Sequence, residues 1–251
     1  MRITLATLLL LSTLQQPAPP PAPSCPELAT AMTALMRNDA RLRDWANLTR
    51  YREANRSVAA ANPQRVVFMG DSITDAWPQR VPAFFEGKPY VGRGISGQTT
   101  PQMLVRFRRD VIDLKPRVVV ILAGTNDIAG NTGVMTDEDI QGNLASMAQL
   151  AKANGIRVVL ASITPVSAYH VAPTGVPQTA SRPMARIRAI NTWIKEYAAT
   201  NGHVYLDYFP AMIDEAGVLR TELSADDLHP NVQGYEIMGP LAEQAIARAL
   251  R

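Results

Sequence analysis

Residues 66–74 read VVFMGDSIT, and this segment is the most informative about the fold. The apolar run Val66–Met69 stops abruptly at Gly70-Asp71-Ser72, which predicts a buried strand followed by a turn that carries a serine. In open α/β sheets, ligands bind at the carboxyl ends of the strands. Ser72 is therefore predicted to be either a nucleophile or a cap for a phosphate group, and the rest of the chain has to decide between the two.

Further apolar runs follow along the chain, and helical segments separate them. The strand-like runs are Tyr90–Val91, Val118–Ala123, Val158–Ala161 and Val204–Leu206. They do not alternate between polar and apolar residues, which is typical of parallel strands buried on both faces. The helical segments are Pro101–Leu114, Asp137–Asn154, Met184–Asn201 and Val232–Leu250. This alternation predicts an α/β fold, a three-layer α/β/α sandwich around a parallel sheet.

The first residues resemble an export signal. Arg2 precedes the apolar run Ile3–Leu14, which is too short to cross a bilayer comfortably, and proline-rich residues follow it. We expect a signal peptide at residues 1–16 and a proline-rich spacer at 17–26. The mature protein is then expected in the periplasm or secreted, without stable insertion in a membrane.

One domain is expected at residues 27–251. Its first segment has a helical stripe, which predicts a helix packed on the domain, with a lid as the alternative. The stripe residues are Leu28, Met32, Leu35, Met36, Leu42, Trp45 and Leu48. Lipid anchoring at Cys25 is the weaker expectation, because Pro23-Ser24 before it and its distance from the apolar run do not suit that processing.

Composition disfavours several classes of function. The chain has 251 residues, of which 47% are hydrophobic, and a formal net charge of +3 with both signs interspersed. It has no basic stripe interleaved with aromatic residues, so no nucleic-acid partner is expected. The single Cys25 excludes an intrachain disulfide, and three scattered histidines do not suit a metal site, so neither a metal nor a cofactor is expected. The oligomeric state is left open.

The three histidines differ in their position relative to the predicted strands. His203 precedes the run Val204–Leu206, at the wrong edge of the sheet, and is predicted to lie at the surface. His170 is in a long loop at the correct edge, either in contact with substrate or simply solvated. His229 lies in a polar turn before the last helix, three residues after Asp226. In that spacing a carboxylate can take the Nδ1 proton and direct Nε2 toward a serine, although the same pair also occurs in ordinary loops.

Two glycine-containing turns supply candidate donors at the same edge. Gly97, in Gly-Ile-Ser-Gly after the second strand, can offer a backbone N–H with no side chain in the way. Asn126, in Gly-Thr-Asn-Asp after the strongest strand, can offer its side-chain amide. Either turn alone is as readily an ordinary turn or helix cap. Together with Ser72 and His229, they form a set with complementary roles in acyl transfer.

Four blocks in this order resemble the SGNH hydrolases, the GDSL-type family, and among them lysophospholipase L1-like, arylesterase-type and carbohydrate acetylesterase members. They are Gly70-Asp71-Ser72-Ile73, the Gly-Ile-Ser-Gly turn ending at Gly97, Gly124-Thr125-Asn126-Asp127 and the segment Asp226–Pro230. The resemblance implies a flavodoxin-like parallel sheet of about five strands and a serine esterase. It implies Ser72 as nucleophile, His229 as base and Asp226 as its partner. It further implies an oxyanion hole made by the N–H groups of Ser72 and Gly97 and the Asn126 side chain.

The substrate is less well defined by the sequence. The loop Thr164–Pro183 is long and carries four prolines, which is typical of functional loops. With Trp77, it is expected to place Tyr169 and His170 against a small ester of a glycan or lipid. Since no strongly apolar lid is evident, short acyl groups are expected, with carbohydrate O-acetylesterase or lysophospholipase activity as alternatives. A non-catalytic module that binds phosphate, flavin or glycan is the alternative from another class.

Overall fold

The computed structural model describes residues 24–58, 62–170 and 175–251. The predicted signal peptide at residues 1–16 lies outside the described residues, and so does most of the predicted spacer. Contacts within the chain define two compact units, Met1–Arg43 and Asp44–Arg251. Within the described ranges, no helix combines the length and the apolar character that a bilayer crossing requires.

The first unit contains helix α1, Cys25–Arg43. Its first two residues, Cys25 and Pro26, are the last two of the predicted spacer. Pro26 is tolerated there because the first helical turn needs no N–H from it. The predicted helix is present. The side chains of Leu28, Met32, Leu35, Met36 and Leu42 are all exposed.

The second unit is built on a five-stranded sheet in which every neighbouring pair is parallel. Its strands are β1 (Val66–Gly70), β2 (Tyr90–Gly94), β3 (Val118–Leu122), β4 (Arg157–Ala161) and β5 (Val204–Leu206), in the spatial order β2-β1-β3-β4-β5. This is the flavodoxin-like order, and the predicted α/β class and parallel sheet are confirmed. Strands β1 and β3 are buried throughout, which explains their uninterrupted apolar sequences.

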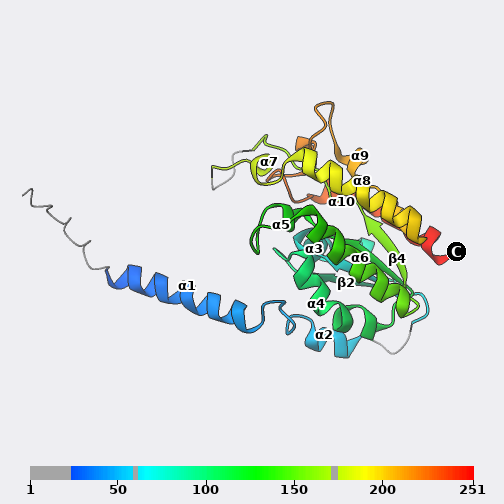
Figure 1. Ribbon diagram of the computed structural model, residues 1–251, viewed down its shortest axis with the longest axis horizontal. Coiled ribbons are helices and arrows are strands. Elements are labelled where there is room, and N and C mark those ends of the chain that lie inside the picture. The colour runs from blue at the N-terminus through cyan, green and yellow to red at the C-terminus, as the bar shows by residue number, and fades with distance from the viewer. Residues whose placement is uncertain (1–23, 59–61, 171–174) are drawn as a thin grey trace, which may run out of the picture. The chain divides into compact units, whose positions relative to one another are not determined.

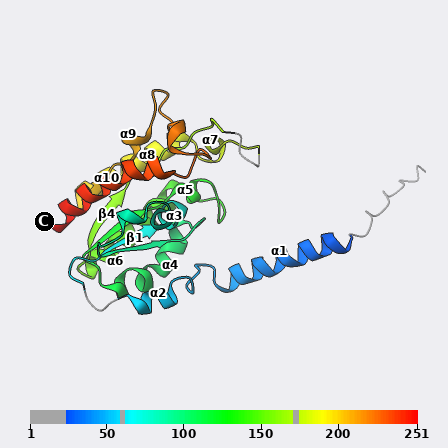
Figure 2. The ribbon, with the colours of Figure 1, turned by 180° about the vertical axis from the view of Figure 1, so that it is seen from behind.

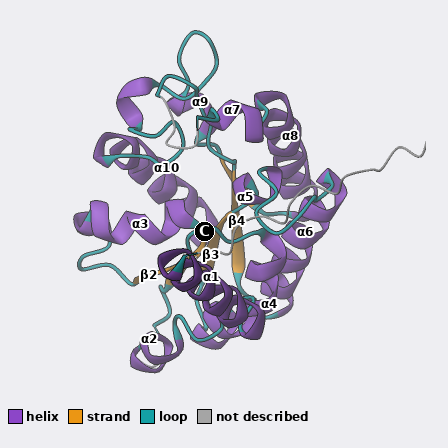
Figure 3. Cartoon of the chain, turned by 90° about the vertical axis from the view of Figure 1, so that its left-hand side faces the viewer, coloured by secondary structure: helices purple, strands orange, loops and turns teal. Residues whose placement is uncertain are grey.

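Helices cover both faces of the sheet (Figure 3). On one face α4 (Thr100–Asp110), α6 (Asp137–Ala153) and α8 (Met184–Asn201) pack on side chains such as Val119 and Ile121. On the other, α3 (Ser72–Arg80) and α10 (Val232–Leu250) pack on Phe68 and Val120. Helix α8 is in front in Figure 1 and α10 in Figure 2, which views the chain from behind. The predicted three-layer sandwich is confirmed.

The long helices match the sequence expectations closely. The ends of α8 and α10 are as predicted, and the predicted helix Pro101–Leu114 is α4 followed by a separate 3-10 turn, Ile112–Leu114. Helix α6 begins at a capping box, in which Thr136 and Asp139 exchange side-chain and backbone hydrogen bonds. The remaining helices are short and lie in loops: α2 (Arg52–Ser57), α5 (Thr125–Ile128), α7 (Gln178–Ser181) and α9 (Phe209–Met212), with 3-10 turns at Pro82–Phe84 and Thr221–Leu223.

Candidate active site

The strand order creates a switch point between β1 and β3. From β1 the chain moves to β2 on one side, whereas β3, β4 and β5 continue on the other. The last residue of β1, Gly70, lies in register with Leu122, the last residue of β3. The segments that follow these strands therefore diverge from adjacent points, where open α/β sheets bind their ligands.

Ser72 occupies the first position of α3, directly after β1. The carboxylate of Asp71 accepts a hydrogen bond from the N–H of Ile73 at 3.0 Å and starts the helix there. A side chain at Gly70 would come within 2.1 Å of the Thr74 hydroxyl, so only glycine lets α3 turn so closely against the strand. Since N–H groups of a first turn have no partner within the helix, the N–H of Ser72 is available to an anion.

The turn that carries His229 is held beside α3 by the start of α10. An antiparallel bridge joins Ser224 to Pro230 at the two ends of this turn. Asn231 caps α10 by accepting from the N–H of Gly234 at 3.1 Å. One turn later, the hydroxyl of Tyr235 donates to the carbonyl of Ile73 at 2.7 Å and ties α10 to α3.

Ser72, His229 and Asp226 form a continuous hydrogen-bonded chain. The Ser72 hydroxyl lies 2.9 Å from His229 Nε2, and His229 Nδ1 lies 2.6 Å from Asp226 Oδ2. Because a carboxylate only accepts, Nδ1 must donate to it, which leaves Nε2 as the acceptor for the serine proton. This is the arrangement of a nucleophile, a base and a group that orients the base.

The environment of Asp226 favours its ionised form. Partial burial raises the pKa of this carboxyl, but hydrogen bonds from the ring and the backbone N–H of His229 outweigh it and hold the pKa well below its usual range. The second oxygen, Oδ1, accepts from the backbone N–H groups of His229 at 2.8 Å and Leu228 at 3.2 Å. The carboxylate is thus fixed on both sides before any substrate arrives.

The predicted donors lie in the two loops next to this chain. Gly97 has φ 79°, in the left-handed region that favours glycine, and it is exposed. Asn126, in contrast, is only 3% exposed, and its amide Nδ2 donates to the carbonyl of Gln98 at 3.0 Å. One of its two N–H bonds is therefore used to join the loops, and the other remains for a ligand.

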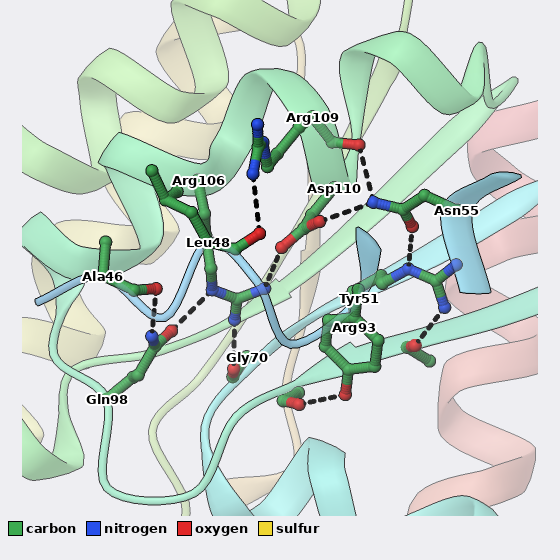
Figure 4. Close-up of polar contacts among 12 residues, drawn as sticks. Ala46, Leu48, Tyr51, Asn55, Gly70, Arg93, Gln98, Arg106, Arg109 and Asp110 are labelled. Carbon is green, nitrogen blue, oxygen red and sulfur yellow. Dashed lines mark hydrogen bonds and ion pairs between the residues drawn. The ribbon is translucent and has the colours of Figure 1, made fainter. Parts of the chain in front are cut away.

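A buried arginine that sequence reasoning did not identify holds these segments together. Arg106 of α4 is fully buried and pairs with Asp110 at 3.1 Å (Figure 4). It donates to the carbonyl of Gly70 at 2.9 Å and to the side chain of Gln98 at 2.5 Å. The end of β1 and the loop after β2 thus share one cation, which fixes Ser72 and Gly97 relative to each other.

The segment before β1 covers the same cluster, and we call residues 44–57 the N-terminal strap. The carbonyl of Ala46 accepts from the Gln98 side chain at 2.8 Å, and Asn55 donates to Asp110 at 2.8 Å and accepts from Arg93 at 2.7 Å. Figure 4 shows these contacts around Arg106. The strap therefore closes the buried polar network from the outside.

Trp77 requires a correction. It was expected to contact substrate, but the structure buries its side chain, with 2% exposure, in the core between the sheet and α10. The ring stacks on Phe84 and on Tyr235, with centroid distances of 4.6 and 5.2 Å. The residue lies more than a helical turn beyond Ser72, on the apolar face of α3 that packs inward.

Tyr169 and His170 are held by carboxylates on neighbouring loops. The Tyr169 hydroxyl donates to Asp214 at 2.6 Å, and its side chain is half-exposed. His170 places Nδ1 2.9 Å from Asp227 Oδ1, and Asp227 Oδ2 accepts its backbone N–H at 2.7 Å. Because Asp227 adjoins Asp226, the bonds to Asp227 attach the loop of Tyr169 and His170 to the turn that carries His229.

The third histidine lies apart from the predicted site, and the arrangement of histidine and acidic side chains bears on metal binding. His203 directly precedes β5, at the amino end of the sheet and away from Ser72, as predicted, and it is half-buried rather than fully at the surface. Across the part of the chain that the structure describes, no group of three or more histidine, cysteine or acidic side chains is arranged to hold a metal ion.

Comparison with known proteins identifies relatives with the same fold and related sequences. A candidate acylhydrolase from Bacteroides fragilis superposes with a TM-score of 0.77 at 42% identity, covering 82% of this chain and 99% of that one. A GDSL-like lipase from Bacteroides thetaiotaomicron superposes with a TM-score of 0.75, also at 42% identity, covering 81% and 98%.

A curated relative is more distant. Esterase TesA of Pseudomonas aeruginosa is 32% identical over 147 residues, which is 58% of this chain and 64% of TesA. The match thus spans slightly less than two thirds of that enzyme's length.

The family assignment rests on the sequence itself. The model of the GDSL-like lipase/acylhydrolase family matches residues 68–237, more than half of the chain, and includes the blocks of Ser72, Gly97, Asn126 and His229. The predicted relationship to ester hydrolases of the GDSL type is confirmed at the level of the family. The chain belongs to the GDSL-like lipase/acylhydrolase family.

Proposed function

We propose that this protein is a serine esterase that hydrolyses carboxylic esters through an acyl-enzyme on Ser72. The observation that supports it most directly is the hydrogen-bonded chain Ser72–His229–Asp226, with distances of 2.9 and 2.6 Å. Family membership supports the same reaction class.

In the first half of the reaction, Ser72 Oγ attacks the acyl carbonyl while His229 Nε2 takes its proton. The tetrahedral oxyanion accepts hydrogen bonds from the N–H groups of Ser72 and Gly97 and from Asn126 Nδ2. His229 then gives its proton to the leaving alcohol oxygen as the C–O bond breaks, and the acyl group remains on Ser72.

In the second half, water takes the place of the alcohol. His229 accepts a proton from the water as it attacks the acyl carbonyl, and returns it to Ser72 Oγ when the acid leaves. Asp226 remains ionised and stabilises the imidazolium at each stage, which its lowered pKa favours.

The labelling of Ser72 tests this proposal. A fluorophosphonate probe should modify the wild-type protein stoichiometrically at Ser72, and Ser72→Ala should lose both labelling and nearly all p-nitrophenyl acetate hydrolysis, with its melting temperature kept. Ser96→Ala is the control, because the Ser96 hydroxyl donates to Asp75 and has no role in the proposed reaction, so this variant should keep both the labelling of Ser72 and the activity. An active Ser72→Ala variant would refute the assignment, and a non-catalytic binding module would show neither labelling nor turnover.

For the substrate we propose esters with short acyl groups. Among the described residues of the loops after β3 and β4, the exposed large apolar side chains are Val134, Tyr169 and Val176. Three such side chains supply less apolar surface than a long acyl chain would cover. A panel of p-nitrophenyl esters should show kcat/KM falling beyond about four carbons, and acetylated sugars and lysophospholipids in the same panel separate the two alternatives.

We also propose that the protein is exported and that residues 1–16 are removed as a signal peptide. The short apolar run after Arg2 supports this. Fractionation of a bacterial host that expresses the full chain, with N-terminal sequencing of the product, tests it. A product that stays in the cytoplasm and keeps Met1 contradicts it, and retention in the membrane fraction with a lipidated Cys25 would favour the anchored alternative.

A further inference from the structure

A second arginine, Arg182, reaches the candidate active site from the end of the long loop Thr164–Pro183. Arg182 as a whole is buried, with 7% of its surface exposed. The guanidinium Nε donates to the hydroxyl of Thr125 at 3.1 Å, and Nη2 lies 3.5 Å from the side-chain oxygen of Asn126. Two bonds from Nη1 hold the guanidinium in place, to Gln178 Oε1 at 2.6 Å and to Ser181 Oγ at 3.1 Å.

These contacts determine which way the Asn126 amide faces. Its nitrogen side lies 3.0 Å from the carbonyl of Gln98, which can only accept, and its oxygen side lies against Arg182, which can only donate. A flipped amide would place two donors together at Arg182 and two acceptors together at Gln98. Only one orientation satisfies both neighbours, and it keeps the NH₂ group on the side of Gln98 and Gly97.

The charge of Arg182 persists at this position although burial lowers its pKa, because the carboxylates of Asp71 and Asp226 act in the opposite direction. A charged donor holds the amide oxygen more firmly than a neutral one. Helix α7 adds to this, since Gln178 and Ser181 at its two ends both bind the guanidinium.

We propose that Arg182 is a positioning residue that fixes the Asn126 amide with its NH₂ group toward the oxyanion formed at Ser72. This inference rests on the proposed esterase function and assigns a role to the last part of the long loop. Arg182 touches no reacting atom in this scheme, and it acts through Asn126.

A double-mutant cycle tests the proposal on the full-length protein with p-nitrophenyl acetate. Arg182→Met should lower kcat about tenfold, the effect of one hydrogen bond from a charged donor, with KM within about twofold. Asn126→Ala should lower kcat by about 10²–10³. In the Asn126→Ala background, Arg182→Met should change kcat by less than about twofold, because its effect has already been removed.

A matched control separates positioning from general stabilisation. Arg186, four residues further on, is also partly buried, and it binds Asp137 at 2.6 Å and the backbone carbonyls of Ile128 at 3.5 Å and Met135 at 2.5 Å, none of which belongs to the proposed oxyanion hole. Arg186→Met should lower the melting temperature and leave kcat unchanged. If Arg182→Met does not fold, Arg182→Lys replaces it, and that variant should keep the charge but lose the paired contacts to Thr125 and Asn126, with a smaller loss of kcat.

Two outcomes overturn the inference. One is wild-type kcat in a folded Arg182→Met or Arg182→Lys variant, and the other is a loss of kcat that multiplies in full with that of Asn126→Ala. Fluorophosphonate labelling distinguishes failure of the positioning role of Arg182 from failure of the proposed esterase function. A wild-type protein that neither labels at Ser72 nor hydrolyses esters refutes both, whereas an active wild type with an unaffected Arg182→Met variant refutes only the positioning role.

Discussion

Asp71 stands directly before Ser72 with its carboxyl group fully buried. Burial raises its pKa to about 6, against the opposing effects of the Ile73 N–H and of His229. One carboxylate oxygen, Oδ2, has no hydrogen-bond partner among the described residues. The group that starts α3 is therefore ionised at neutral pH in a place that disfavours its charge.

This predicts an unusual dependence of stability on pH. Asp71 has a higher pKa folded than unfolded, so its ionisation destabilises the fold as pH rises from about 4 to above 6, by up to about 3 kcal/mol. Asp71→Asn removes that titration and keeps an acceptor for Ile73. Relative to wild type, the variant should gain stability as pH rises over this window, measured by urea unfolding at several pH values. A difference that does not vary with pH contradicts the prediction.

At the scale of elements, the N-terminal ends of α3 and α10 have to lie close together so that the Ser72 hydroxyl can reach the His229 ring. The Tyr235 hydroxyl, which donates to the Ile73 carbonyl, makes this contact between their first turns. Tyr208 lies in the same core, and its hydroxyl is buried with no partner among the described residues. The two tyrosines therefore form a natural pair for comparison.

Tyr235→Phe should destabilise the protein by about 1–3 kcal/mol, because it leaves a buried carbonyl without its donor. Tyr208→Phe should be neutral or stabilising, since it removes a buried hydroxyl that makes no hydrogen bond with the described residues. Calorimetric melting of both variants checks this. Equal losses of stability in the two variants would show that the hydrogen bond between α3 and α10 does not account for the effect of Tyr235→Phe.

At the scale of the whole molecule, the compact unit that holds the site begins at Asp44. The N-terminal strap belongs to this unit, and it satisfies buried polar groups of α4 and of the loop after β2. Helix α1 belongs to the other unit, although it directly precedes the strap in sequence.

Two truncations should therefore behave differently. Removal of residues 1–43 should leave the melting temperature and esterase activity nearly unchanged. Removal of residues 1–57 leaves several buried donors and acceptors unpaired, at about 1–3 kcal/mol each, and should lower the melting temperature by about 10 °C or more. Similar melting temperatures for the two truncated proteins would show that the strap is dispensable.

From the sequence, the five strands, the long helices and their order could be predicted, and Ser72, Gly97, Asn126, Asp226 and His229 could be proposed as site residues. Patterns of this kind are local: buried parallel strands read as apolar runs, and Asp226 and His229 are three residues apart. The three-dimensional structure was needed to place Trp77 in the core and to show that Arg106, Arg182 and the strap contact the segments that carry these residues.

The physical reason is distance along the chain. Arg182 is 56 residues from Asn126, Arg106 is 36 from Gly70, and Tyr235 is 162 from Ile73. Such contacts depend on which side chains face each other after the sheet and helices have packed, and they leave no periodic signal in the sequence. The residues that carry the proposed chemistry were therefore predictable, whereas the residues that hold them in place were not.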